Sequence, residues 1–198
     1  MRAYYVKIVC LVGAESTGKT TLSQALAGHY DTVWVPEYGR DYTVEKVRKD
    51  PSDGWRSEEF THIAAEQSRR EDLAARDANR VLICDTDAMA TAIWHERYLE
   101  TRSEEVEAIA AGRRYDLYIL TAADIPWEDD GTRDGEHVRQ WMHGRFLEEL
   151  QRRGRPWVLV SGSREQRLAT AIAHIDALLA PPPAHPAITV EISRTAAP

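Results

Sequence analysis

Residues 13–20 have the sequence Gly-Ala-Glu-Ser-Thr-Gly-Lys-Thr and match G-x-x-x-x-G-K-[ST], the pattern of a phosphate-binding P-loop. An apolar run, residues 4–12, precedes them, and a stretch of helical composition, residues 20–29, follows. This order of strand, glycine turn and helix is the context that the motif requires. Backbone N–H groups can close around phosphate oxygens because glycine has no Cβ, and the helix N-terminus adds unpaired donors. The sequence therefore predicts a site for a nucleoside triphosphate.

The residues of this loop have distinct expected parts in binding ATP. Lys19 is expected to reach the β- and γ-phosphates, and the Thr20 hydroxyl is expected to ligate Mg²⁺. The other residues expected to bind the nucleotide are Gly13, Glu15, Ser16, Thr17, Gly18 and Thr21, together with Arg164 from a later loop. ATP and Mg²⁺ are the predicted cofactors.

Composition restricts the class of protein. The chain has 198 residues, 43% of them hydrophobic, which is enough for one well-formed core. A net charge of −7 argues against a broad surface for nucleic acid or anionic membrane. No apolar run approaches the roughly 20 residues that span a bilayer, and no signal peptide is evident before Tyr4. We expect a cytoplasmic enzyme without nucleic-acid or membrane partners. The sequence leaves both a monomer and a homo-oligomer possible.

The cysteines and histidines give no indication of a metal or redox centre. Cys10 and Cys84 both lie in apolar runs, so we expect small buried thiols rather than a disulfide. His95 and Glu96 are not followed by a second histidine at helical spacing, as a zinc protease requires. We therefore expect them on the surface.

Short apolar runs alternate with longer amphipathic stretches along the chain. There are five runs rich in β-branched, aromatic or leucine residues: 4–12, 32–36, 81–85, 115–121 and 157–161. Near-continuous apolar strands that alternate with helices predict an α/β protein with a five-stranded parallel sheet covered on both faces, as in the P-loop hydrolase and kinase fold. We expect one domain over residues 1–180 and a proline- and alanine-rich tail over residues 181–198.

Two helices have recognisable starts. Two pairs of residues have the spacing of a capping box, Thr101 with Glu104 and Ser163 with Gln166. In a capping box, each side chain of the pair accepts a backbone N–H from the other residue. Trp141 lies on the apolar stripe of another predicted helix, so we expect it in the core.

Charged residues follow the second and third strands, where ligands of open parallel sheets bind. Glu37 is expected to orient a substrate hydroxyl and accept its proton, and Arg40 to clamp a phosphate or carboxylate. A surface ion pair between them is the alternative. Residues 81–85 resemble a Walker B strand, whose Asp85 is expected near Mg²⁺. Asp87 could share the metal, accept a substrate hydroxyl or simply form a turn.

Residues 121–133 predict a lid, because their glycine and acidic residues form a poor helix ahead of a well-patterned one. A lid would close over the phosphates and exclude water. Arg133 is then expected to stabilise charge on the transferring phosphoryl group; an ordinary surface ion pair is the alternative. Tyr38 and Trp127 lie in predicted site loops and could stack on a planar base or a cationic ring, whereas core packing is expected for Trp34 and Trp55.

Together these motifs resemble the ribosylnicotinamide kinase domain of bacterial NadR-type proteins. The resemblance covers residues 6–179 and depends on the P-loop, residues 36–42 (Pro-Glu-Tyr-Gly-Arg-Asp-Tyr), residues 85–87 (Asp-Thr-Asp) and residues 127–133. It implies a P-loop kinase fold that uses ATP and Mg²⁺ to phosphorylate the 5′-hydroxyl of nicotinamide riboside, giving nicotinamide mononucleotide. Proteins of this type usually carry an adenylyltransferase domain, and sometimes a helix-turn-helix, ahead of the kinase. Because this chain starts at the kinase strand, we expect neither activity.

Three other classes of P-loop protein are alternatives to a nicotinamide riboside kinase. A deoxynucleoside or other nucleoside kinase fits Val35-Pro36-Glu37, although the Asp/Glu-Arg-Ser motif of deoxynucleoside kinases is replaced here by residues 85–87. A nucleotide-binding regulatory ATPase normally adds a helical lid domain, and the residues after the last strand leave little room for one. A GTPase is disfavoured, because guanine specificity normally needs an N-K-x-D loop. The only Asn in the chain, Asn79, is followed by Arg80 rather than Lys.

Overall fold

The computed structural model describes residues 6–128 and 135–181. Residues 182–198 of the predicted tail lie outside the described residues, and so do residues 129–133 of the predicted lid, including Arg133.

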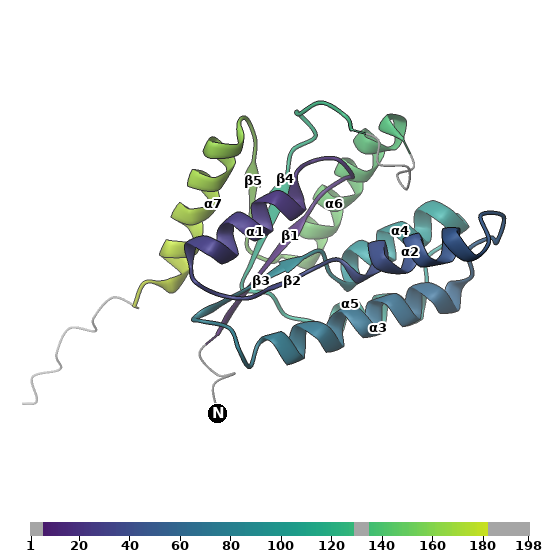
Figure 1. Ribbon diagram of the computed structural model, residues 1–198, viewed down its shortest axis with the longest axis horizontal. Helices are drawn as coiled ribbons and strands as arrows, with labels where there is room; N and C mark the ends of the chain where they lie inside the picture. Colours follow the sequence, from purple (N-terminus) through teal and green to yellow (C-terminus); the bar gives the residue numbers. More distant parts are fainter. Residues whose placement is uncertain (1–5, 129–134, 182–198) are drawn as a thin grey trace, which may run out of the picture.

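A five-stranded parallel sheet forms the centre of the molecule, in the order β2-β3-β1-β4-β5 (Figure 1). The strands are β1 (Lys7–Val12), β2 (Trp34–Val35), β3 (Val81–Asp85), β4 (Leu117–Thr121) and β5 (Trp157–Val160). The central strand β1 lies between β3 and β4, with Val9 opposite both Ile83 and Leu117. The predicted fold is confirmed, although most strands are shorter than the apolar runs that predicted them.

Helices cover both faces of the sheet (Figure 1). One face is covered by α1 (Lys19–His29) and α7 (Arg164–Leu179), and the other by α3 (Ser57–Ala74), α4 (Ala88–Leu99), α5 (Glu104–Gly112) and α6 (Arg139–Arg153). Side chains of β1 alternate between the two layers: Val9 and Leu11 pack toward α1 and α7, whereas Cys10 and Val12 pack toward the other four helices. Both faces of the strand are therefore buried, which explains its continuous apolar sequence.

Helix α2 (Tyr38–Lys49) differs from the others, because none of its residues, all of them described, is buried. It lies along α3 and starts directly after the second strand, where the sequence analysis expected a loop. A short 3-10 turn, η1 (Glu136–Val138), precedes α6. Among the described residues, no helix is long and apolar enough to cross a membrane.

Several local predictions can be compared with the structure. Cys10 and Cys84 are buried free thiols, as expected, and burial raises the pKa of both. The capping box at the start of α7 is also confirmed. The cap predicted at Thr101 is wrong: Ser103 caps α5, because its Oγ accepts the N–H of Val106 at 3.3 Å.

Two side chains differ in burial from the prediction, His95 and Trp141. His95 was expected on the surface but is 1% exposed; its Nε2 lies 2.8 Å from Ser57 Oγ and its Nδ1 lies 2.8 Å from the Thr101 carbonyl oxygen. Trp141 was expected in the core but is 40% exposed, since Met142 and its helical neighbours occupy the buried stripe of α6.

Candidate active site

The P-loop joins β1 to α1 and depends on two glycines. Gly13 has φ of 149° and Gly18 has φ of 78°, conformations that residues with a side chain rarely adopt. A Cβ at Gly13 would overlap Thr121 Oγ1 on the neighbouring strand β4 and would lie 2.9 Å from the Thr121 carbonyl oxygen. Gly18 occupies the N-cap position of α1. The fit between the P-loop and β4 therefore requires glycine at position 13.

Buried polar side chains hold the P-loop in place through hydrogen bonds. Thr17 Oγ1 donates to the Ala14 carbonyl at 2.7 Å and lies 2.7 Å from Thr121 Oγ1. Two buried arginines donate to loop carbonyls: Arg167 to Thr17 at 3.0 Å and Arg139 to Ser16 at 3.2 Å. The loop is therefore fixed by the fold itself. The sequence analysis did not identify either arginine, because they lie inside helices far from the motif.

Lys19 and Thr20, the last two residues of the P-loop, have different partners. Lys19 Nζ donates to the carbonyls of Gly13 at 3.0 Å and Ala14 at 2.8 Å. Thr20 Oγ1 donates to Asp85 Oδ2, at the end of β3, at 2.6 Å. Burial raises the pKa of the Asp85 carboxyl, and the nearby Lys19 and Thr20 oppose that rise. A cation and a carboxylate thus lie together at the carboxyl end of the sheet.

A cavity of about 610 Å³ extends from the P-loop to helices α3 and α4. At its phosphate end it is lined by the charged and glycine-rich residues of the loop and by two arginines of α7, Arg164 and Arg167. At its other end it is lined mainly by apolar and aromatic side chains, with three polar ones among them: Trp55, Phe60, Ile63, Trp94, Tyr98, Thr43, Gln67 and Thr91. One continuous space can therefore hold phosphates at one end and a ring at the other.

The aromatic end is a packed wall rather than a set of separate rings. The Trp55 ring centre lies 4.9 Å from that of Phe60 and 5.2 Å from that of Tyr98. Trp94 stacks on Tyr98, with ring centres 5.7 Å apart and planes 23° apart. Aromatic faces of this kind bind flat or cationic rings.

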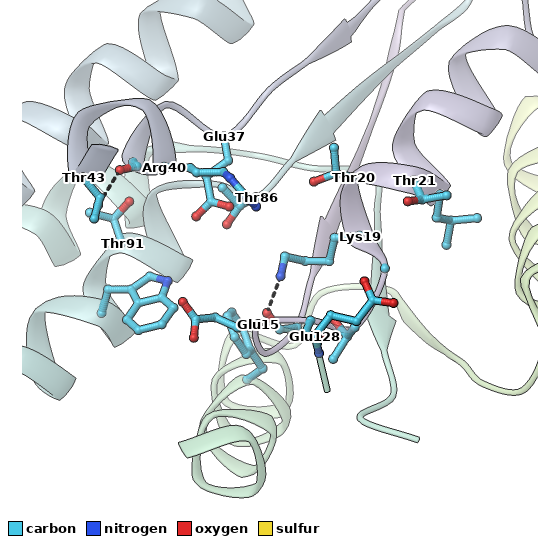
Figure 2. A pocket seen from close by; sticks show the side chains of 18 of the residues that line it. Glu15, Lys19, Thr20, Thr21, Glu37, Arg40, Thr43, Thr86, Thr91 and Glu128 are labelled. Carbon is cyan, nitrogen blue, oxygen red and sulfur yellow. Dashed lines mark hydrogen bonds between the residues drawn. The ribbon is translucent and has the colours of Figure 1, made fainter. Parts of the chain in front are cut away.

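Glu37 and Arg40 enter the cavity between its two ends. Figure 2 shows both side chains pointing from the start of α2 into the space that Lys19 and Glu15 enter from the P-loop. Burial raises the pKa of the Glu37 carboxyl, whereas the positive charges of Lys19 and Arg40 lower it. A carboxylate at this position therefore lies between the phosphate end and the aromatic end.

Most of the predicted site residues line this cavity. The structure brings together there Gly13, Glu15, Ser16, Thr17, Gly18, Lys19, Thr20, Thr21, Glu37, Arg40 and Arg164. Asp85 is hydrogen-bonded to Thr20, which lines the cavity. Their individual roles in binding and catalysis stay predictions.

Asp87 lies elsewhere, contrary to its predicted contact with substrate or metal. It is 1% exposed and is not among the described residues that line the cavity. Its Oδ1 accepts the N–H of Ala90 at 3.0 Å and caps α4, and its Oδ2 accepts the hydroxyl of Tyr118 at 2.8 Å. Both oxygens are thus used inside the fold, which agrees with the alternative that Asp87 forms the turn.

The two aromatic residues predicted to stack on the substrate also lie outside the cavity lining. The Tyr38 hydroxyl is 2.9 Å from His62 Nε2, and its ring faces the guanidinium of Arg70 at 4.3 Å. The Trp127 ring lies 5.7 Å from the guanidinium of Arg139. Neither ring is among the described residues that line the cavity.

The aromatic wall was the main feature that the sequence analysis missed. Trp94 and Tyr98 are four residues apart on α4, a spacing that places them on one helical face. The rule that ligands bind at the ends of strands points to the segments after strands, whereas Phe60, Trp94 and Tyr98 lie inside α3 and α4. Trp55 was assigned to the core, yet it packs against the core and lines the cavity as well.

The fold and the site together define a P-loop protein with the architecture of a small-molecule kinase: a P-loop after the central strand of a parallel sheet, and a walled cavity facing it. The chain belongs to the AAA domain family, whose model matches residues 8–167.

The chain is similar to NadR proteins both in sequence and in structure. The chain is 32% identical over 151 residues to the trifunctional NAD biosynthesis/regulator protein NadR of Salmonella typhimurium, an alignment that covers 76% of this chain and 37% of that protein. Among solved structures, a NadR protein in complex with NR superposes with a TM-score of 0.72 at 25% identity, covering 89% of this chain and 52% of that one. A NadR protein in complex with NAD and AMP-PNP gives 0.71 at 24% identity, covering 89% and 50%. The chain thus spans well under two thirds of each relative.

Proposed function

We propose that this chain is an ATP- and Mg²⁺-dependent kinase that phosphorylates the 5′-hydroxyl of nicotinamide riboside, giving nicotinamide mononucleotide for NAD salvage. The observation that carries the proposal is the continuous cavity from the P-loop to an aromatic wall, with Glu37 between them. The similarity to NadR, including a NadR structure in complex with NR, supports the same substrate. A cytoplasmic location, where ATP is available, is part of the proposal.

The phosphate end of the cavity suits a triphosphate. Backbone N–H groups of the P-loop and the N-terminus of α1 supply donors, and Lys19 and Arg164 supply positive charge. In the structure Lys19 Nζ is held by the Gly13 and Ala14 carbonyls, so its ammonium is already at the mouth of the loop. Placed charges of this kind stabilise a transferring phosphoryl group without reorganisation.

The residues beside Thr20 fit Mg²⁺. Asp85 Oδ1 is buried and has no hydrogen-bond partner among the described residues, which leaves a carboxylate oxygen available to a cation. Asp85 and Thr20 are hard oxygen donors, and Mg²⁺ takes few protein ligands when it binds together with phosphates and water. The described residues contain no group of three or more His, Cys, Asp or Glu side chains placed to bind a metal alone. When bound, Mg²⁺ would neutralise part of the phosphate charge.

The other end of the cavity suits the cationic ring of nicotinamide riboside. Trp55, Trp94 and Tyr98 line this end, and aromatic faces attract a cation through their quadrupoles. The carboxylates of Glu15 and Glu37 also enter the cavity, where either could lie beside a positive ring (Figure 2). Thr43 and Thr91 offer hydroxyls for the polar groups of the ribose and carboxamide.

Glu37 is the group proposed to receive the proton of the 5′-hydroxyl. The hydroxyl oxygen bonds to the γ-phosphorus, the bond from that phosphorus to the β–γ bridging oxygen breaks, and ADP leaves. The raised pKa of Glu37 makes it a stronger base than an exposed glutamate. Phosphoryl-transfer transition states are loose, so the carboxylate acts mainly by orienting the hydroxyl. Ile125 and Pro126, from the segment after β4, line the cavity and reduce the access of water.

A substrate panel tests the proposal. Purified protein with ATP and Mg²⁺ should convert nicotinamide riboside to nicotinamide mononucleotide with a higher kcat/KM than it shows for thymidine, deoxycytidine or adenosine. Faster turnover of a deoxynucleoside would contradict the proposed substrate and favour the alternative kinase. ATP hydrolysis without phosphorylation of any nucleoside would favour the regulatory ATPase.

A further inference from the structure

The residue that precedes helix α2 does not cap it. Three other helices are capped by the side chain of the residue before them: Asp87 before α4, Ser103 before α5 and Ser163 before α7. Glu37 occupies the same position before α2, yet its side chain makes no capping hydrogen bond to the described backbone. Its carboxylate points into the cavity instead (Figure 2). The first turn of α2 must therefore find its hydrogen-bond acceptor elsewhere.

Gln67, in the middle of α3, supplies that acceptor. The backbone N–H of Tyr38, the first residue of α2, donates to Gln67 Oε1 at 2.9 Å. Gln67 is 1% exposed, and loss of this acceptor would leave the Tyr38 N–H unsatisfied, which is costly. The cap of α2 thus comes from a neighbouring helix rather than from the residue that precedes it.

The orientation of the Gln67 amide is set one turn further along α3. Gln67 Nε2 donates to Glu71 Oε1 at 3.4 Å, and Glu71 Oε2 accepts from Arg113 and from the Tyr115 hydroxyl, each at 2.8 Å. The ionised Glu71 carboxylate only accepts hydrogen bonds, and the Tyr38 N–H only donates, so Gln67 must turn its NH₂ group toward Glu71. Its carbonyl oxygen then faces Tyr38. The buried network on α3 therefore selects the amide orientation that caps α2.

We propose that Gln67 is a positioning residue for the reaction, because by capping α2 from α3 it keeps the Glu37 carboxylate in the cavity. Without Gln67, the unpaired N–H at the start of α2 and the positive end of the helix dipole would draw the Glu37 carboxylate back to cap its own helix. The carboxylate would then leave the acceptor hydroxyl. This inference rests on the proposed function, in which Glu37 orients that hydroxyl.

A double-mutant cycle tests the proposal. Gln67→Met keeps the length of the side chain but removes the acceptor, and it should lower kcat by about 10²-fold, as small displacements of a positioning group do, with little change in the KM for ATP. In a Glu37→Gln background the same substitution should change kcat by less than about 2-fold, since the group it positions is already lost. Gln24→Met, the same change on an exposed part of α1, should leave kcat unchanged.

Equal effects of Gln67→Met in both backgrounds would overturn the inference, because Gln67 would then act independently of Glu37, for example by touching the substrate. Failure of the proposed function looks different: wild-type protein would not phosphorylate nicotinamide riboside, and the cycle would be run with the nucleoside that it does phosphorylate. Hydrogen exchange gives a second measurement that needs no turnover. The Tyr38 amide should exchange at least about 10-fold faster in Gln67→Met, and an unchanged rate in a folded variant would also overturn the inference.

Discussion

Thr20 Oγ1 donates a 2.6 Å hydrogen bond to Asp85 Oδ2, and this contact joins the P-loop to the end of β3. The other oxygen, Asp85 Oδ1, is buried without a partner among the described residues. A strand-end carboxylate is thus held by the residue that is proposed to share the metal with it.

Asp85→Asn should raise the Mg²⁺ concentration needed for half-maximal activity, because it removes the anionic oxygen at this position. Asp87→Asn should lower the melting temperature instead, since Asp87 caps α4 inside the fold. Activity measured across a Mg²⁺ titration distinguishes the two. A shift in metal dependence with Asp87→Asn and none with Asp85→Asn would show that the two carboxylates have been assigned the wrong way round.

Lys19→Ala should nearly abolish phosphoryl transfer and leave the fold intact. The substitution removes a fixed positive charge from the transferring group, and single contacts of this kind are often worth about 2.7–4 kcal/mol, or about 10²–10³ in kcat. Lys49→Ala, at the exposed end of α2, is the matched control and should behave as wild type. Steady-state rates and circular dichroism check both. Near-normal turnover by Lys19→Ala would contradict the role given to the P-loop.

Glu37→Gln should lower kcat by about 10²–10⁴-fold, because the amide cannot accept the proton of the 5′-hydroxyl. ATP affinity should change much less, since removing a carboxylate near the triphosphate does not weaken phosphate binding. Steady-state rates with nicotinamide riboside and a separate ATP titration measure the two effects. Wild-type kcat in this variant would mean that another group orients the hydroxyl.

Trp94→Leu should raise the KM for nicotinamide riboside by about 10-fold and leave the KM for ATP unchanged, because a cation–π contact is worth about 0.5–2 kcal/mol. Trp141→Leu is the control, since Trp141 is 40% exposed on α6 and does not line the cavity among the described residues. If the two variants give the same KM for nicotinamide riboside, the aromatic wall does not bind the ring.

The stability of the protein should depend on pH through Glu71. Burial raises the pKa of this carboxyl from 4.5 to about 7, and Arg113 and Tyr115 oppose the rise. The folded state therefore holds a proton that the unfolded state releases between these values. The free energy of unfolding should fall as pH rises through this window, by up to about 3 kcal/mol. Glu71→Gln should remove that part of the fall.

Urea unfolding at pH 5, 6, 7 and 8 measures the dependence for wild type and for Glu71→Gln. Glu104→Gln, at an exposed position on α5, controls for the loss of one acidic side chain. Identical pH profiles for wild type and Glu71→Gln would show that Glu71 is not the group responsible.

The strands and the P-loop could be predicted because their evidence is local. The apolar residues of β1 and β3 are continuous in sequence, and the glycines at positions 13 and 18 identify the loop by their spacing. Helix α2 gave no comparable pattern, since none of its described residues is buried. An apolar stripe is the main sign of a helix, so a fully exposed one is easily taken for a loop.

The placement of individual side chains in the site was less predictable. Asp85 ends β3 and Asp87 follows it by two residues, yet only Asp85 is hydrogen-bonded to the P-loop. The difference comes from Tyr118, which lies on another strand and binds the Asp87 carboxylate. The wall residues Trp94 and Tyr98 lie within α4, several residues along the chain from the end of β3. Contacts of this kind depend on how distant segments pack, which composition and spacing do not specify.

The hydrogen bonds of Arg167 bear on the rate at which a nucleotide associates with the P-loop. Its guanidinium donates to the carbonyls of Thr17, Ala122 and Gly162, and it pairs with Asp124. The P-loop and the ends of β4 and β5 are therefore tied together before any nucleotide arrives. The conformational entropy of ordering the loop is lost during folding rather than during association. Association with ATP should then need no slow rearrangement of the loop, and its rate should be set by diffusion and orientation.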